Sequence, residues 1–236
     1  MGMKKRVLIT GGSKGVGRAT ALRLAREGAA VALLARGQDA LDAVVREITV
    51  AGGVAIAVAA DVGDAAQVGA AVERVIAALG GLDGLVLNAA VGKHGPVETY
   101  AIAAWQESIA TMLTGPFLVT QAALPALKAA GEARIVAVGS GAAYAGYAGL
   151  SSYCAAKWGL RGFMLALAEE VKADGIRCCY LSPGSILTDF AGRSVAEKQA
   201  QPGKTFLLPD DVADAIAYLL TQSAHVWTQE MNLWPV

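Results

Sequence analysis

The chain has 236 residues, 55% of them hydrophobic, and its 20 Lys and Arg balance its 20 Asp and Glu. An α/β fold of this length commonly forms one domain with a large core, so we expect a single domain over 1–236. The basic residues are scattered rather than gathered into the patch that nucleic acid or an anionic membrane requires, which argues against both partners.

Three cysteines, Cys154, Cys178 and Cys179, form no paired framework and no CxxC metal-ligand spacing. We interpret them as reduced packing residues and expect no metal site. The apolar run after the basic opening is too short for a signal peptide, and no apolar run reaches the roughly 20 residues of a membrane span. We therefore expect a soluble, cytoplasmic protein.

Short apolar runs alternate with longer alanine-rich stretches of helical period, which is the pattern of a parallel α/β sheet. Strands are predicted at 6–10, 30–35, 54–60, 82–88, 133–139, 176–182 and 230–234. Helices are predicted at about 16–28, 38–51, 64–79, 101–130, 151–174 and 209–222. Several strands are apolar throughout, as expected where helices cover both faces. The sequence predicts a doubly wound α/β fold with about seven parallel strands.

The segment 185–208 interrupts this alternation, because it is polar and carries glycine and proline. Such a composition predicts a mobile loop or short helices over a site.

A glycine-rich turn, "TGGSKGVGRA", directly follows the first predicted strand and contains Gly11, Gly15 and Gly17. Glycine lets the backbone turn sharply and approach a ligand, and the next helix presents free N–H groups to a pyrophosphate. The alternative is a turn that binds no ligand. The position between the first strand and the first helix favours a nucleotide site.

The spacing Thr-Gly-xxx-Gly-x-Gly after the first strand resembles that of the short-chain dehydrogenase/reductase family. Members of the family carry further motifs in a fixed order, and the chain matches them with Asp61, "LNAA" at 87–90, Ser140, Tyr153 with Lys157, and "SPGSILT" at 182–188. The resemblance covers most of the chain. It implies a Rossmann-type sheet, a nicotinamide cofactor, and interconversion of a carbonyl with an alcohol.

The second strand indicates which nicotinamide cofactor is used. After such a strand, an acidic residue binds the ribose hydroxyls, whereas a basic residue pairs with a 2′-phosphate. Here Arg36 follows Ala35 at the strand end, and Lys14 stands in the glycine turn. The alternative is that both cations are solvated surface residues. Because a guanidinium and an ammonium form charge-assisted bonds with phosphate, we favour NADP(H) over NAD(H).

The other cofactor contacts are implied by the resemblance. Asp61 has two candidate roles: it caps the helix that starts near residue 64, or it binds the adenine amino group while Val62 packs on the ring. Ala90 stands where the family usually has glycine. The predicted cofactor-binding residues are Gly11, Ser13, Lys14, Gly15, Val16, Gly17, Arg36, Asp61, Val62, Asn88, Ala89, Ala90, Tyr153, Lys157, Pro183, Gly184, Ile186 and Thr188.

Reduction of a carbonyl needs a hydride, which the cofactor carries, and a proton for the oxygen. A tyrosine with a pKa near ~10 is a poor acid-base catalyst unless a positive charge stabilises its phenolate. Lys157 lies one helical turn after Tyr153 and on the same helical face. The resemblance implies that Tyr153 is the acid-base, Lys157 its partner and ribose anchor, and Ser140 the oxyanion donor. The alternatives are a core tyrosine, a solvated lysine and a turn serine.

Met112 departs from the family pattern, which places an Asn there to hold a water that links the lysine to bulk solvent. A thioether cannot position a water as an amide does. Either the proton relay runs through Ser108, Thr111 or Thr114, or turnover is slower than is typical.

The substrate candidates are a 3-oxoacyl thioester and a small ketone or aldehyde. Tyr144, Tyr147 and Trp158 either line the substrate pocket or fill core or subunit contacts. The alternative function is an NADP-binding sensor or scaffold with little catalysis. A hydrolase is disfavoured, because His94 and His225 are far apart in the sequence and lack the carboxylate and nucleophile pattern that a hydrolase needs.

The resemblance also implies a homodimer or homotetramer, paired through the helices at 101–130 and 151–174. The tetramer contact in the family depends on a glycine-rich C-terminal ending. This chain instead ends in "TQEMNLWPV", with Trp234 and Pro235.

Overall fold

The structure is a computed structural model and describes residues 5–236. Residues 1–4, which belong to the basic opening considered above, lie outside it. The strands are β1 (Arg6–Thr10), β2 (Ala30–Ala35), β3 (Val54–Ala59), β4 (Gly84–Leu87), β5 (Ala133–Val138), β6 (Ile176–Pro183) and β7 (Glu230–Leu233). They form one parallel sheet in the order β3-β2-β1-β4-β5-β6-β7. The predicted doubly wound Rossmann-type sheet is confirmed.

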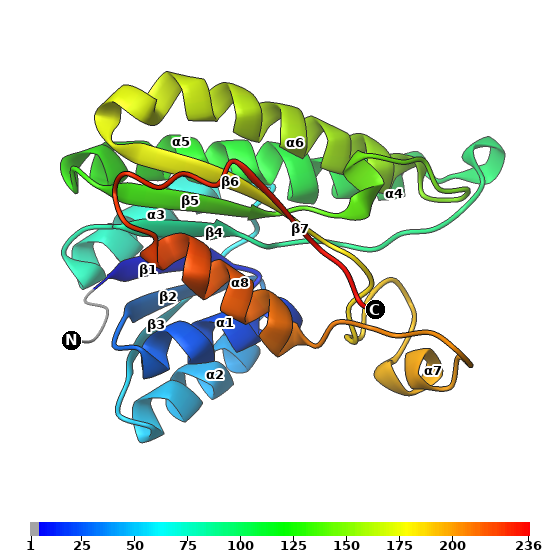
Figure 1. The fold of residues 1–236 in the computed structure, drawn as a ribbon, viewed down its shortest axis with the longest axis horizontal. Coiled ribbons are helices and arrows are strands. Elements are labelled where there is room, and N and C mark those ends of the chain that lie inside the picture. Colours follow the sequence, from blue (N-terminus) through cyan, green and yellow to red (C-terminus); the bar gives the residue numbers. More distant parts are fainter. Residues whose placement is uncertain (1–4) are drawn as a thin grey trace.

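Helices cover both faces of this sheet (Figure 1). The helices are α1 (Gly15–Arg26), α2 (Gln38–Val50), α3 (Ala65–Leu79), α4 (Ile102–Ile109), α5 (Gly115–Ala129), α6 (Ser151–Val171), α7 (Val195–Gln199) and α8 (Pro209–Thr221). In the figure, α5 and α6 lie above the sheet, α2 lies toward the bottom, and α8 is drawn in front of the strands. The core has two corresponding clusters, because alternate strand residues point to opposite faces. Leu8 of β1 belongs to the cluster of α3, α5 and α6, whereas Val7 and Ile9 belong to that of α1, α2 and α8.

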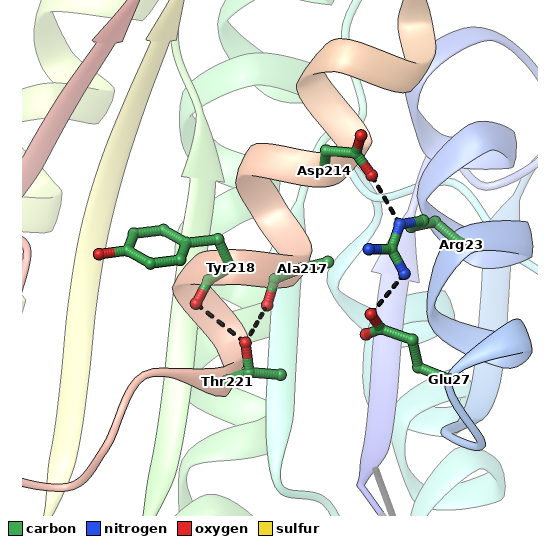
Figure 2. Close-up of polar contacts among 6 residues, drawn as sticks. All are labelled: Arg23, Glu27, Asp214, Ala217, Tyr218 and Thr221. Carbon is green, nitrogen blue, oxygen red and sulfur yellow. Dashed lines mark hydrogen bonds and ion pairs between the residues drawn. The ribbon is translucent and has the colours of Figure 1, made fainter. Parts of the chain in front are cut away.

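Helix α8 crosses from the C-terminal half of the chain to pack against α1 in the N-terminal half (Figure 2). Its Asp214 accepts a hydrogen bond from Arg23 Nε at 2.6 Å, and Arg23 also pairs with Glu27 on its own helix. The last turn of α8 is closed by Thr221, whose hydroxyl donates to the Ala217 carbonyl at 2.8 Å. These contacts fix the helix whose N-terminal end follows the segment 185–208.

The predicted helix at 101–130 contains a π-helical turn, Ala110–Thr114, between α4 and α5. Pro116 gives the physical reason: its ring clashes with the carbonyl four residues back, that of Met112, and it has no N–H to donate to that carbonyl. Gly115 N–H instead bonds the Ala110 carbonyl, five residues back. Such π-turns are frequent at functional sites. Met112 lies in the middle of this turn.

Helices α4 and α5 and the π-turn form a continuous helix, Ile102–Ala129, of 28 residues. By length and composition alone it is sufficient to cross a membrane, although Gln106, Glu107 and Ser108 interrupt its apolar residues. Helix α5 packs on β4, β5 and α3, and α4 packs on α6. The packing of this helix into the fold explains its apolar character.

The segment 185–208 contains α7 and has both ends joined to each other. Leu187 N–H donates to the Leu207 carbonyl at 2.8 Å, and Leu207 N–H donates to the Ser185 carbonyl at 2.9 Å. A capping box of Ser194 and Glu197 starts α7. The segment is therefore a loop whose two ends are hydrogen-bonded to each other, and it carries the short helix α7 (Figure 1).

Candidate active site

The carboxyl ends of the parallel strands surround a cavity of about 1010 Å³. In open α/β sheets this edge is where ligands bind. With the exception of Gly17, every residue predicted to bind the cofactor or to act in catalysis lines this cavity. These residues are Gly11, Ser13, Lys14, Gly15, Val16, Arg36, Asp61, Val62, Asn88, Ala89, Ala90, Ser140, Tyr153, Lys157, Pro183, Gly184, Ile186 and Thr188.

The glycine turn forms a tight cradle at the N-terminus of α1. Gly11 and Gly15 have φ values of +67° and +53°, which favour glycine. Gly17 lies behind the turn, and a Cβ there would come within 2.1 Å of the Gly11 carbonyl oxygen. The backbone therefore needs all three glycines, and the cradle leaves the first N–H groups of α1 directed at the cavity. It fits a dinucleotide pyrophosphate.

Asn88 holds this cradle in place from the end of β4. Its side-chain amide donates to the carbonyl oxygens of Thr10 and Gly11 at 3.0 and 3.3 Å. The Thr10 hydroxyl accepts in return from the N–H groups of Asn88 and Ala89. Ala90 lies outside the positive-φ region, so alanine is accommodated where the family usually has glycine.

Asp61 and Asp64 have distinct roles at the end of β3. Asp64 caps α3, because its carboxylate accepts from the N–H groups of Ala66 and Gln67, at 3.0 and 3.1 Å, which also lowers its pKa. Asp61 accepts from Gly63 N–H at 2.9 Å and lines the cavity. Of the two roles considered for Asp61, helix capping belongs to Asp64.

Arg36 contacts a carboxylate that sequence analysis did not identify. Glu107 of α4 lies 3.6 Å from Arg36 Nη1 and 3.0 Å from Lys93 Nζ. These two cations hold the pKa of Glu107 below its usual value, the hydrogen bond from Lys93 being the larger cause. The guanidinium of Arg36 is largely exposed, as is Lys14 on the opposite side of the cavity. Both cations are therefore accessible to a phosphate group.

Ser140, Tyr153 and Lys157 converge on the cavity from two elements. Ser140 follows β5, while Tyr153 and Lys157 lie on α6. The Ser140 Oγ accepts from Ala142 N–H at 3.2 Å, which leaves the hydroxyl proton free to donate elsewhere. Lys157 is buried, and its ammonium donates to the Val138 carbonyl at 2.7 Å and lies 5.7 Å from the centre of the Tyr153 ring.

Burial controls the protonation of both α6 residues. It raises the pKa of Tyr153, and a hydrogen bond with Ser140 partly opposes this rise. It lowers the pKa of Lys157 to about 8. In this structure burial outweighs any lowering of the Tyr153 pKa by Lys157, whose ammonium donates to the Val138 carbonyl and lies 5.7 Å from the ring centre. Tyr153 is a neutral phenol at neutral pH, which is the form that donates a proton.

Met112 is buried, with 1% of its surface exposed, in the π-turn. Of the three residues proposed to replace the missing Asn, only Thr111 lines the cavity. Ser108 donates to the Ala104 carbonyl and accepts from Ser152, and this chain of bonds ends at that carbonyl. Thr114 is exposed and lies outside the cavity lining.

The segment 185–208 lies over the cavity. Lys198 of α7 donates to the carbonyls of Ile186 and Thr188 at 3.0 and 2.7 Å, so α7 is joined to the segment that carries Thr188. The Phe190 ring meets the Tyr153 ring edge-on, with centroids 6.1 Å apart. The predicted position of this segment, over a site, agrees with these contacts.

Trp234 is a cavity residue that sequence analysis treated only as part of an atypical C-terminus. Its indole packs against Gly141 and Gly184, which follow the adjacent strands β5 and β6. A Cβ at Gly141 or Gly184 would come within 2.6 or 2.9 Å of the ring. Sequence spacing gives no signal for this contact, because β7 and the two glycines meet only through the sheet order.

The fold and the cavity together define an α/β oxidoreductase with a Rossmann-type nucleotide site. A family model described as short chain dehydrogenase matches residues 5–199, and the chain belongs to this family, as its motifs predicted. The chain is 37% identical over 223 residues to a cis-4-hydroxycyclohexanecarboxylate dehydrogenase of Sinomonas cyclohexanicum, covering 92% of this chain and 89% of that protein.

Two further relatives cover nearly the whole chain. A 3-oxoacyl-[acyl-carrier-protein] reductase of Synechocystis is 35% identical over 231 residues, which covers 96% of this chain and 94% of that protein. The crystal structure of a metagenomic short-chain oxidoreductase in complex with NADP has a TM-score of 0.86 and 35% identity, and covers 100% of this chain and 99% of that one.

Proposed function

We propose that the chain is an NADP(H)-dependent oxidoreductase that interconverts a ketone or aldehyde with an alcohol, with Tyr153 as its acid-base. The observation that carries this proposal is the convergence of Ser140, Tyr153 and Lys157 on the cavity that also contains the glycine cradle. The NADP complex of a close structural relative supports the choice of cofactor.

The residues present fit NADP(H). The cradle of Gly11, Gly15 and Gly17 has room only for backbone, which suits the pyrophosphate. Arg36 and Lys14 supply positive charge for a 2′-phosphate. Thr188 and Lys157 also line the cavity, and the family resemblance implies that they hold the carboxamide and the nicotinamide ribose. When bound, the cofactor supplies the hydride for the carbonyl carbon.

The protein residues then act on the carbonyl oxygen. The Ser140 hydroxyl donates a hydrogen bond to this oxygen as negative charge develops on it. The Tyr153 phenol transfers its proton to the same oxygen. The buried Lys157 ammonium stabilises the phenolate that remains, because electrostatic attraction is strong away from water. Reprotonation completes the cycle, and Thr111 is the best-placed side chain for a relay where Met112 replaces the family's Asn.

A panel of carbonyl compounds, including cyclic ketones and 3-oxoacyl thioesters, tests this function through loss of NADPH absorbance. We expect wild-type protein to consume NADPH with at least one compound. Tyr153→Phe should lose about 100-fold or more in kcat, since general acid-base catalysis is commonly worth 10² or more, while its NADPH affinity changes little.

The alternative is an NADP-binding sensor or scaffold of the same fold, which Met112 favours because it replaces a relay residue. If the wild-type protein binds NADPH but consumes none with any compound of the panel, the sensor or scaffold replaces the enzyme. Equal kcat values for wild type and Tyr153→Phe would contradict the role of the tyrosine.

We also propose that 1–236 forms a single cytoplasmic domain that assembles as a homodimer or homotetramer. Large apolar side chains are exposed along α4, α5 and α6, the helices through which the family pairs subunits; they include Ile102, Trp105, Phe117, Trp158 and Leu165. The Phe117 and Phe163 rings pack edge-on across α5 and α6, which joins these helices into one apolar surface.

A further inference from the structure

Tyr180 of β6 has no part in the function proposed above, yet it contacts both elements of the catalytic group. Its side chain is completely buried. The phenol oxygen accepts a hydrogen bond from the Ser140 backbone N–H at 3.2 Å and donates one to the Lys157 carbonyl at 3.3 Å. One hydroxyl thus joins the turn after β5 to helix α6.

Gly139 provides the space for this contact. A Cβ at Gly139 would lie 2.0 Å from Cζ of Tyr180 and 2.3 Å from its hydroxyl oxygen. The tyrosine ring therefore fills the space that a side chain at position 139 would need. Gly139 N–H also donates to the Leu181 carbonyl at 2.6 Å, which fixes the spacing of the two strands at this point.

The hydroxyl matters because the part-buried Ser140 backbone N–H needs a partner. Ser140 stands where β5 ends, beyond the last residue paired in the sheet register, so its N–H has no strand partner in that register. The Tyr180 hydroxyl accepts a hydrogen bond from this N–H and donates another to the Lys157 carbonyl. Lys157 is the residue whose ammonium is proposed to stabilise the Tyr153 phenolate. A shift of about 1 Å between catalytic groups can cost on the order of 10²-fold in rate.

We infer that Tyr180 is a positioning residue, whose hydroxyl sets the location of Ser140 relative to Tyr153 and Lys157. This inference rests on the proposed function of the three catalytic residues. It adds to the reaction a side chain from the interior of the sheet that touches neither substrate nor cofactor.

The charged groups near Tyr180 do not ionise its phenol at the pH values used for the assay. The Tyr144 ring packs edge-on at 6.4 Å, and the Arg161 guanidinium lies over that ring and pairs with Glu230. Burial raises the pKa of Tyr180 well above its ordinary value. The hydrogen bond from the Ser140 backbone opposes this rise, Tyr153 and Tyr144 add to it, and Arg161 opposes it slightly. The Tyr180 phenol therefore remains neutral. If Tyr180→Phe changes how the rate depends on pH, the change reports the ionisation of Tyr153 and not that of Tyr180.

Tyr180→Phe removes the hydroxyl and keeps the ring. We expect kcat for carbonyl reduction to fall about 10-fold, which corresponds to one buried hydrogen bond, while the NADPH dissociation constant changes less than about 2-fold. The Ser140 hydrogen bond lowers the pKa of Tyr153. If Tyr180→Phe weakens this hydrogen bond, the pKa of Tyr153 should rise. Alcohol oxidation needs the Tyr153 phenolate, so the pH at which the oxidation rate falls on the acidic side should move to a higher value.

Two further variants identify the route of the effect. Ser140→Ala and the double variant Ser140→Ala/Tyr180→Phe should have similar kcat values, because Tyr180 acts through Ser140. Tyr144→Phe is the matched control: it alters a neighbouring ring outside the cavity lining and should behave as wild type. Gly139→Ala displaces the Tyr180 ring and should reproduce the fall in kcat if Tyr180→Phe is unstable.

Amide hydrogen exchange at Ser140 provides a measurement that does not depend on turnover. Its N–H should exchange about 10-fold faster in Tyr180→Phe than in wild type, and at the wild-type rate in Tyr144→Phe. Unchanged exchange at Ser140 would overturn the inference, as would full additivity of the Ser140 and Tyr180 effects on kcat. A wild-type protein that reduces no carbonyl would overturn the proposed function instead, and the exchange result would still decide the role of Tyr180.

Discussion

At the scale of single residues, burial determines how the proposed catalytic residues Tyr153 and Lys157 ionise. Tyr153 and Lys157 share a helical face, but the ammonium donates to a backbone carbonyl, and desolvation acts on both groups. Desolvation disfavours the charged form of each, so the tyrosine remains a phenol and the lysine loses its charge more easily. The pair is suited to donating a proton at neutral pH.

The pKa of Lys157 gives a pH prediction. Because burial lowers it to about 8, the ammonium is present below this pH and is lost as the pH rises through it. The value of kcat/KM for NADPH, which reports groups of the free enzyme, should therefore fall above about pH 8 in the direction of carbonyl reduction. Initial rates between pH 6 and 10 measure this. A profile that stays flat up to pH 10 would contradict the prediction.

At the scale of elements, the π-turn between α4 and α5 lies beside the cavity. Gly115 follows the turn, and a Cβ there would come within 2.9 Å of Val62 Cγ2, so the helix lies directly against a cavity residue. Thr111, within the turn, lines the cavity, whereas Met112 points into the core. The relay position of the family is thus occupied by an apolar side chain.

Met112→Asn tests the consequence of this replacement. We expect turnover to stay the same or to rise, because an amide can hold the water that a thioether cannot. Met112→Leu is the control, since it keeps volume and apolar character and should leave kcat unchanged. Steady-state rates and thermal unfolding of both variants measure this. A large fall in the kcat of Met112→Asn with the fold intact would show that position 112 needs no relay residue.

At the scale of the whole molecule, the two faces of the sheet differ in what they expose. The face of α4, α5 and α6 presents Trp158 with half of its surface exposed, and the face of α8 presents Tyr218 with a similar fraction, 55%. On the first face, large exposed apolar side chains come from all three helices: Ile102 and Trp105 from α4, Phe117 from α5, and Trp158 and Leu165 from α6. We therefore expect subunits to pair on that face.

Trp158→Glu should convert the assembly to monomers, because a charge in an apolar interface is costly to bury. Tyr218→Glu, on α8, is the matched control and should leave the assembly unchanged. Sedimentation velocity measures the oligomeric state of each. A wild-type protein that sediments as a monomer, or a Trp158→Glu variant that sediments like wild type, would show that this face does not pair subunits.

The amino-acid sequence by itself determined the strands, the glycine cradle and the order of the proposed catalytic residues. These are local properties: hydrophobic period, the need for glycine at positive φ, and the separation of Tyr153 from Lys157 by one helical turn. Strand bounds predicted from it agree with the structure to within two residues at each end. The order of motifs along the chain was sufficient to identify the family, because each motif follows a particular strand.

Only the tertiary structure decided the contacts between elements that are distant in the sequence. The π-turn was not predicted, because its cause, Pro116, reads equally well as an ordinary residue near a helix N-terminus. Glu107 beside Arg36, Trp234 on two glycines and Tyr180 between Ser140 and Lys157 all depend on which strands and helices become neighbours. Burial, which sets the pKa values of Tyr153 and Lys157, is likewise a property of the packed molecule and not of any one segment.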